Sequence, residues 1–314
     1  MMDIYSQLEH LRQKSNNWGN LCIGAFVMFF VLLFILPFIV IGLGPSMNRN
    51  IDPNEFKILF WVIGMGFMVL IAVASVQKSK YYKQFQSLYK NNFLVGLLRQ
   101  WFPDAQFNWE QGFTEQAVNA VGLVERGNRF HSEDFICGTY NGVFFEQSDV
   151  TIKRVVRSGK HTHTYTHFKG RMFTFNYDMK DIASTLVFSD SFGYKGHGFN
   201  LRYEKVPVES VHFNDKFKIR SVRPVDAFYV LTPQMMECVM RLNDYLGNIA
   251  LHFTPGKVHV GFNTNINAFD VNVKNPIDFR REAELRRQDM QIIIDIINAL
   301  KISNDNKPIY NNQF

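Results

Sequence analysis

Residues 21–44 read LCIGAFVMFFVLLFILPFIVIGLG and residues 58–76 read ILFWVIGMGFMVLIAVASV, and neither run contains a charged side chain. About 20 apolar residues span the roughly 30 Å hydrocarbon core of a bilayer as a helix. The backbone must satisfy its own hydrogen bonds in lipid, so each run is expected to be helical. The first run is too long for the apolar region of a signal peptide and lacks a small-residue cleavage site. The two runs therefore predict a transmembrane hairpin over residues 21–76.

Basic residues are common on both sides of this hairpin and scarce in its connecting loop. The segment before the first run carries Arg12 and Lys14, and several lysines follow the second run. The loop has two basic residues, and two acidic residues offset them. Because basic residues that flank a span favour the cytoplasmic side, the sequence predicts a multi-pass protein of the cell membrane with both termini in the cytoplasm. The same lysines can contact anionic headgroups, which makes the lipid bilayer a predicted partner.

The composition narrows the function classes. The net charge is +6, and the lysines beside the spans account for several of these charges. The remainder is only mildly basic, so we expect no nucleic-acid partner. The three cysteines, Cys22, Cys137 and Cys238, lie far apart without a C-x-x-C pair. This sparse, odd number fits a reducing compartment, and each cysteine is expected to be a small buried apolar residue.

The region behind the hairpin is predicted to begin with helices. In residues 77–110, aromatic and leucine side chains recur at helical spacing until Pro103 ends the pattern, which predicts a juxtamembrane helix. Three more helices are expected: residues 114–121 capped by Thr114, residues 233–246 capped by Thr232, and a last helix from about Ile277.

Strand signals dominate the middle of the chain. An Asn-Gly pair separates residues 135–140 from residues 143–146, and this pair is the strongest short-range hairpin signal because a type I′ turn needs positive φ at both central positions. A second hairpin is predicted to join residues 249–253 to residues 258–262. Further strands are predicted at residues 150–156, 171–177, 185–188, 218–222 and 227–231.

These elements predict an α+β fold, with an N-terminal two-helix transmembrane hairpin followed by an antiparallel β-rich soluble domain with segregated helices. The expected parts are a cytoplasmic N-terminus (1–20), a transmembrane hairpin (21–76), a juxtamembrane helix (77–110), a cytoplasmic α+β domain (111–302) and a polar tail (303–314). The sequence leaves open a second domain boundary within residues 190–215, and it leaves open self-association into a homo-oligomer.

The order of these pieces resembles a known family. Behind the membrane hairpin come GTYNGVFF at residues 138–145, FKGRMFTF at residues 168–175 and DAFYVLTP at residues 226–233. Together they resemble a bacterial two-pass membrane family catalogued as domain of unknown function 3137, over most of residues 1–300. The second piece, with Met172 and Phe173 at its centre, follows the family pattern loosely. The motifs are turn glycines, core aromatics and a helix start, so the resemblance implies a membrane-anchored bacterial protein and supplies no catalytic residues.

Three histidines are the candidates for a metal site. His161, His163 and His167 have the same parity on a predicted strand, and three imidazoles on one face suit zinc or copper. Several lysines and arginines precede them, and such cations disfavour a metal ion. A solvated hairpin tip is therefore the favoured interpretation, and no metal or cofactor is predicted.

Other polar features carry weaker signals for chemistry. The glycine-rich stretch at residues 193–198 is followed by no convincing helix start, which favours a loop over a phosphate cradle. Asp178, Asp181 and Asp190 are scattered through predicted loops without a paired base or nucleophile. The arginines of the last helix, within residues 280–287, could bind acidic lipid or RNA, but ion pairs with nearby acids on a solvated face are favoured.

The sequence supports two functional hypotheses of different classes. The favoured one is a membrane-anchored cytoplasmic binding or scaffold module of unknown ligand, with a protein as its expected partner beside the bilayer. It follows from the anchor, the hairpin-rich sheet and the lack of a catalytic motif. The alternative is a membrane-bound hydrolase or metal-dependent enzyme that uses the histidine strand and the loop aspartates. Convergence of His161, His163 and His167 in the structure would favour the enzyme.

Overall fold

The computed structural model describes residues 3–43, 53–192 and 203–305. The chain forms two compact units, one made of Met1–Phe93 with Val271–Glu282 and the other of Leu94–Asp270 with Ala283–Phe314. The predicted fold class is confirmed, because two apolar helices lead the chain and an antiparallel sheet with separate helices follows them.

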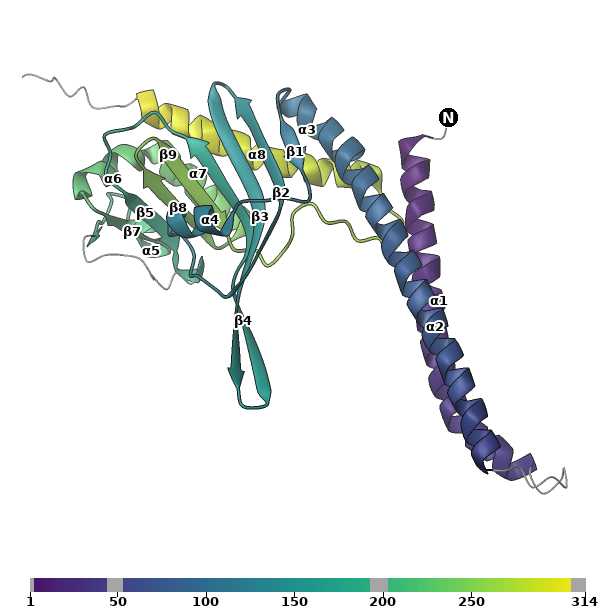
Figure 1. Ribbon diagram of the computed structural model, residues 1–314. Helices are drawn as coiled ribbons and strands as arrows, with labels where there is room; N and C mark the ends of the chain where they lie inside the picture. Colours follow the sequence, from purple (N-terminus) through teal and green to yellow (C-terminus); the bar gives the residue numbers. More distant parts are fainter. Residues whose placement is uncertain (1–2, 44–52, 193–202, 306–314) are drawn as a thin grey trace, which may run out of the picture. The chain divides into compact units, whose positions relative to one another are not determined.

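Two long helices make up most of the first unit. α1 (Ile4–Leu43) and α2 (Pro53–Leu88) run side by side (Figure 1). Within the described chain, the stretches Ile4–Ile35 and Phe60–Trp101 are long and apolar enough to cross a membrane, and few residues of their apolar windows are buried. One helix runs from Ile4 onward through both the predicted N-terminal segment, residues 1–20, and the first apolar run.

A segment from near the end of the chain completes this unit. Residues Val271–Glu282 belong with the helix pair rather than with the sheet that precedes them. The buried Arg12 guanidinium donates a hydrogen bond to the Val273 carbonyl at 3.2 Å. The Tyr89 hydroxyl donates to the Glu282 carboxylate at 2.5 Å. The helix pair therefore gains part of its packing from residues far along the chain.

Helical structure in the segment predicted as a juxtamembrane helix, residues 77–110, extends as far as Trp101. α2 continues through a π-helical turn, Tyr89–Leu94, into α3, Val95–Trp101. Pro103 follows the C-cap residue Phe102, and proline cannot continue a helix because it lacks the amide donor. The prediction was wrong for the end of residues 77–110, where the short strand β1 (Gln106–Asn108) begins the sheet.

The second unit is built on one sheet, which has nine strands in the described residues. Its order is β1-β2-β3-β4-β9-β8-β5-β7-β6, and every neighbouring pair is antiparallel. The remaining strands are β2 (Arg129–Tyr140), β3 (Val143–Ser158), β4 (His161–Asn176), β5 (Thr185–Ser189), β6 (Glu204–Lys205), β7 (Phe217–Ser221), β8 (Ile249–Thr254) and β9 (Lys257–Phe262).

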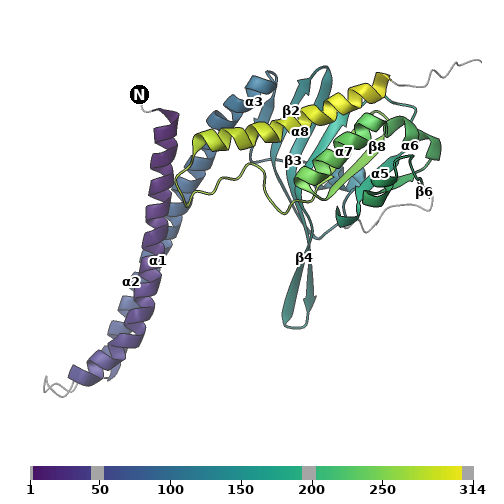
Figure 2. The ribbon, with the colours of Figure 1, turned by 180° about the vertical axis from the view of Figure 1, so that it is seen from behind.

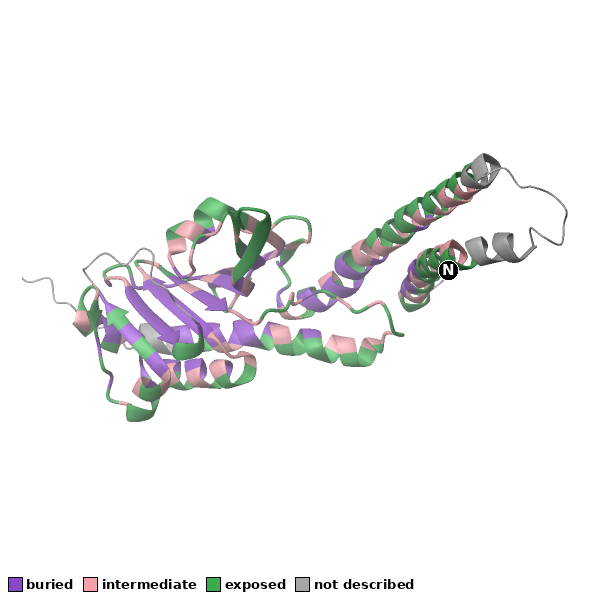
Figure 3. Cartoon of the chain, turned by 90° about the horizontal axis from the view of Figure 1, so that it is seen from below, coloured by how far each residue is buried: buried purple, intermediate pink, exposed green. Residues whose placement is uncertain are grey.

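Helices cover the two faces of this sheet unequally. Most of them lie on one face (Figure 2), where α8 and α7 pack on the larger apolar core, and the strands beneath are mostly buried (Figure 3). The other face, here called the α4 face, carries α4 and a smaller apolar core. The helices of this unit are α4 (Glu115–Val121), η2 (Asp190–Phe192), α5 (Val211–Lys216), α6 (Pro224–Val230), α7 (Pro233–Leu246) and α8 (Phe279–Asp305).

Two strand predictions were wrong. Residues 227–231 belong mainly to α6, which begins with Pro224 at its first turn. A short run of five apolar residues in the sequence does not by itself distinguish a helix from a strand. Residues 143–146 and 150–156 are not separate strands but parts of the single strand β3. Buried polar side chains in between, such as Ser148, break the apolar pattern without breaking the strand.

The turn and cap predictions were confirmed. Asn141 and Gly142 have φ of 47° and 79°, as a type I′ turn requires. The Thr232 hydroxyl accepts from the Met235 amide at the start of α7, and Gly247 ends that helix with φ of 67°. β5 and β7 pair with each other, so the sheet continues across the segment that was considered as a domain boundary.

Candidate ligand-binding site

A row of polar side chains crosses five adjacent strands on the α4 face. The strand register places Cys137 of β2 opposite Glu146 of β3, Glu146 opposite Thr174 of β4, and Thr174 opposite His259 of β9. His259 in turn lies opposite His252 of β8. Directly opposed side chains in an antiparallel sheet lie on the same face, about 5 Å apart at their Cβ atoms. Residues from five strands therefore form one continuous polar row, here called the polar row.

Hydrogen bonds fix the two histidines of the polar row. The Thr174 hydroxyl and His259 Nδ1 are 3.0 Å apart. His252 Nδ1 is 2.6 Å from the Val121 carbonyl at the end of α4, and the Tyr203 hydroxyl is 3.4 Å from His252 Nε2. A carbonyl only accepts, so the neutral His252 carries its proton on Nδ1 and leaves Nε2 as the acceptor. The row is thus held by α4 on one side and by its own strands on the other.

Burial controls the charge of this row. Desolvation lowers the pKa of His259 to about 4, and the neighbouring His252 and Lys257 charges add to this effect. Desolvation also lowers the pKa of His252, although its bond to Val121 opposes the change. Burial and the Glu146 charge raise the pKa of the Cys137 thiol. Near neutral pH the row therefore offers two uncharged imidazoles and an uncharged thiol.

An open pocket of about 550 Å³ lies between α4 and the polar row. Its polar side chains are Thr114, Glu146, Thr174, Thr254, Lys257 and His259. Its apolar walls come from the α4 segment and from the strands beneath, and they include Phe113, Val118, Val121, Phe135 and Met172. This size, with mostly apolar walls and a few polar groups on rigid strands, is typical of pockets that bind small molecules. We call it the α4 pocket.

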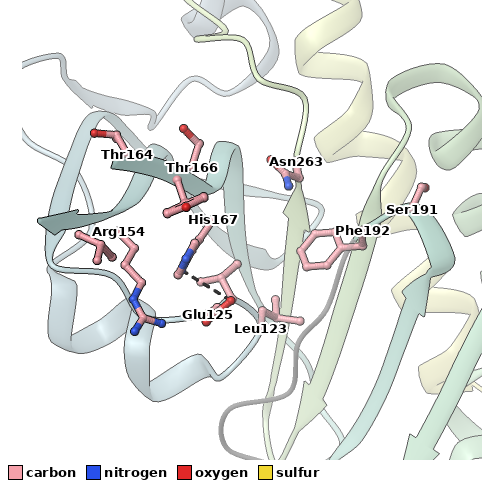
Figure 4. Close-up of a pocket in the computed structure, with 12 residues that line it drawn as sticks. Leu123, Glu125, Arg154, Thr164, Thr166, His167, Ser191, Phe192 and Asn263 are labelled. Atoms are coloured by element: carbon pink, nitrogen blue, oxygen red, sulfur yellow. Dashed lines mark ion pairs between the residues drawn. The ribbon is translucent and has the colours of Figure 1, made fainter. Parts of the chain in front are cut away.

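A second pocket of about 690 Å³ lies at the opposite ends of β4 and β9 (Figure 4). His167 points toward Glu125 there, with Nδ1 3.7 Å from the carboxylate and 3.2 Å from the Arg126 carbonyl. Arg154 and Asn263 also line it. The pocket is polar and open to solvent, and its polar groups come from loops and from the projecting part of β3 and β4.

The structure separates the three predicted histidines. His167 lies in the second pocket, whereas His161 and His163 are exposed near the β3–β4 turn. No group of three or more histidine, cysteine or acidic side chains that could hold a metal ion occurs in the described parts of the chain. His161, His163 and His167 do not converge, so the structure lacks the arrangement that would have favoured a metal-dependent enzyme.

The other candidate residues have structural partners. Asp190 pairs with Lys218, and the Asp181 carbonyl accepts from Arg223 at 2.6 Å. The glycine-rich stretch at residues 193–198 lies outside the described residues. Cys238 is buried as expected, but that expectation was wrong for Cys22 and Cys137, which are partly exposed.

One arginine of the last helix departs from the predicted solvated face. Arg286 is buried and pairs with Asp289 at 3.0 Å, and Asp289 also pairs with Arg171 of β4 at 2.7 Å. Asp149 lies opposite Arg171 and accepts from the Ala268 amide at 2.6 Å. Burial raises the pKa of Asp149 to about 7, and the Arg171 charge limits the rise. This ionic cluster joins α8 to the sheet on the face away from the polar row.

Known proteins offer limited comparison. Residues 166–302 match the family described as Protein of unknown function (DUF3137). The predicted resemblance is thereby confirmed for this stretch, which contains Thr174, His252 and His259, whereas Glu146 precedes it. No curated protein matches the sequence. Among solved structures, the mycobacterial trehalose monomycolate transport factor A, TtfA, is similar with a TM-score of 0.34 and 9% identity, over 66% of this chain and 96% of that chain. A likeness of that size carries no argument about function.

The polar row is the feature that sequence reasoning missed. Its residues are separated by up to 122 positions and belong to no motif, since His259 and His252 each read as one histidine in an apolar strand. The available signal was the turn geometry. Each two-residue turn fixes which residues face each other, and this pairs Cys137 with Glu146 and His252 with His259.

Proposed function

We propose that this chain is a membrane-anchored binding module whose sheet domain takes a small molecule into the α4 pocket. The polar row carries this proposal, because uncharged hydrogen-bonding groups beside a carboxylate lie on the floor of a largely apolar pocket. The matching ligand has an apolar body and a polar end that exchanges hydrogen bonds with His259, Thr174 or Glu146. We further propose that the domain is cytoplasmic, on the strength of the lysines behind the second span.

Binding suits this chemistry better than catalysis. The hydrogen bond between Thr174 and His259 resembles a nucleophile paired with a base, and this is the best geometric case for the hydrolase alternative. A general base works best when its pKa lies near the operating pH. With a pKa of about 4, His259 is a weak base at neutral pH, but its neutral ring can still donate and accept hydrogen bonds.

A pocket-filling variant tests the proposal. Ala117 lines the α4 pocket, so Ala117→Trp is expected to occupy the space of the ligand. Gln116→Trp is the matched control, because Gln116 is the exposed neighbour on α4 and does not line this pocket. Small molecules extracted from the full chain, purified in detergent, are compared by mass spectrometry.

We expect one species, with an apolar body, in the wild type and in Gln116→Trp but not in Ala117→Trp. Identical extracts from the three proteins, with unchanged melting temperatures, would contradict binding in the α4 pocket. If Ala117→Trp lowers the melting temperature, His259→Leu gives a second test, because it removes the polar partner and leaves the opening of the pocket unchanged.

A further inference from the structure

Beyond the sheet, β3 and β4 continue as a two-stranded ribbon (Figure 1). β2 pairs with β3 only as far as Lys153, and β9 pairs with β4 only from Arg171 onward. Residues between these limits pair only with each other, around a turn at Gly159 with φ of 58°. We call residues 153–167 the arm.

The base of the arm is fixed to the rest of the domain. The Asn128 side chain donates to the Val155 carbonyl and accepts from the Val155 amide, both at 2.8 Å. The Asn128 amide donates to the Lys153 carbonyl at 3.0 Å. The arm is therefore held at its base, while almost all of its side chains from Arg154 onward are exposed.

The arm carries an uncompensated positive charge. It contains four cations and no acidic residue, and the nearest acids along the chain are Asp149 and Asp178. The cations are Lys153, Arg154, Arg157 and Lys160. None of the four forms an ion pair with a carboxylate in the described part of the chain. Charges of one sign on a thin ribbon repel each other. Contact with an anionic surface would offset this repulsion, which the isolated domain retains.

The arm also presents an aromatic ring among these cations. The register places Tyr165 opposite Arg154 and His163 opposite Val156, so these four side chains share one face of the ribbon. Tyr165 is 56% exposed and Val156 is 39% exposed. Tyrosine and arginine side chains often lie in the headgroup region of a bilayer, because each has an apolar body and a polar end.

We infer that the arm contacts the surface of an anionic bilayer. The inference rests on the membrane anchor of the proposed function, because the anchor keeps the domain near one bilayer and raises the effective concentration of the arm at its surface. It does not depend on the α4 pocket. The partner is recognised by negative charge, since each basic residue near an anionic membrane surface favours the contact by roughly 5-fold.

A photo-crosslinking phenylalanine analogue at Tyr165 of the full chain tests this contact. Tyr245 on α7 is the matched control position, because it is also an exposed tyrosine, at 55% against 56%. The chain is reconstituted into vesicles of phosphatidylcholine alone or of phosphatidylcholine with phosphatidylglycerol, and lipid adducts are measured by mass spectrometry. The second variant replaces Lys153, Arg154, Arg157 and Lys160 together by glutamine.

We expect lipid adducts at position 165 in the anionic vesicles, and at least about 10-fold fewer in neutral vesicles or after the four glutamine substitutions. Raising the salt to roughly 0.5 M should reduce them similarly, because screening shortens the reach of surface charges. Equal adducts at positions 165 and 245, or adducts to protein instead of lipid at position 165, would overturn the inference.

Resistance of the reconstituted chain to alkaline extraction is measured in the same vesicles. Extraction of the chain would overturn the anchor and the arm contact together, whereas an anchored chain without charge-dependent adducts would overturn the arm contact alone.

Discussion

Replacing His259 by glutamine should change how the stability of the domain depends on pH. In the folded protein the pKa of His259 is about 4, whereas an unfolded histidine titrates near 6.5. The unfolded chain therefore binds more protons between these values, and stability is lost as the pH falls through this window. A difference of about 2.5 pKa units corresponds to at most about 3.4 kcal/mol.

Glutamine is uncharged at every pH and keeps a hydrogen-bonding group toward Thr174. The free energy of unfolding of the wild type, minus that of His259→Gln, should therefore fall by up to about 3 kcal/mol between pH 7 and pH 4. Urea unfolding of the full chain in a neutral detergent, followed by tryptophan fluorescence, measures this difference. A difference that stays constant to within about 0.5 kcal/mol over this range would refute the assignment of His259 as a desolvated, neutral imidazole.

Four further predictions follow from other parts of the chain. Gly142→Val should destabilise the domain by roughly 1 kcal/mol or more, because φ of 79° strains a β-branched residue, whereas Gly142→Asn should be tolerated; equal melting temperatures would contradict the turn. Asp149→Asn should remove a pH dependence of stability whose sign is opposite to that of His259, because the folded pKa of Asp149, about 7, exceeds the unfolded value. In the wild type, up to about 4 kcal/mol of stability is therefore lost as the pH rises from 4 through 7. The same pH dependence of urea unfolding in the wild type and in Asp149→Asn would contradict this prediction. A protein that starts near Asn91 should melt cooperatively without α1 and α2, because it keeps the buried Leu94 and Leu98, and aggregation of every such protein in circular dichroism samples would show that these two helices belong to the fold. A reporter that fluoresces only in the cytoplasm, fused after Phe314, should be bright, and signal from an exterior reporter there would reverse the proposed topology.

Local turn and cap chemistry made much of the fold predictable. A two-residue Asn-Gly turn has one favoured geometry, and Thr232-Pro233 at a helix start satisfies one orphan amide and removes another. Both signals act within a few residues, so the sequence contains them fully. The apolar run at residues 227–231 follows Pro224 at a helix start, but Arg223 before it provides no side-chain cap, so the signal is weaker than at Thr232.

Two pairs within the polar row were predictable from the sequence, but the connection between these pairs was not. The Asn141-Gly142 turn pairs Cys137 with Glu146, and the turn at Pro255 and Gly256 pairs His252 with His259. The link between these pairs is the pairing of β4 with β9, which places Thr174 beside His259 although 85 residues separate them. Pairing at that distance along the chain is decided by the packing of the whole domain, so local pattern reasoning does not reach it.

The segment Val271–Glu282, which packs with α1 and α2, has a consequence for biosynthesis. Arg12 precedes its partner Val273 by 261 positions, so it is synthesised well before that partner. The helix pair is therefore synthesised well before this segment can pack against it. A prematurely terminated chain would keep Arg12 without its carbonyl partner, and this unfilled surface would distinguish an incomplete product from a finished one.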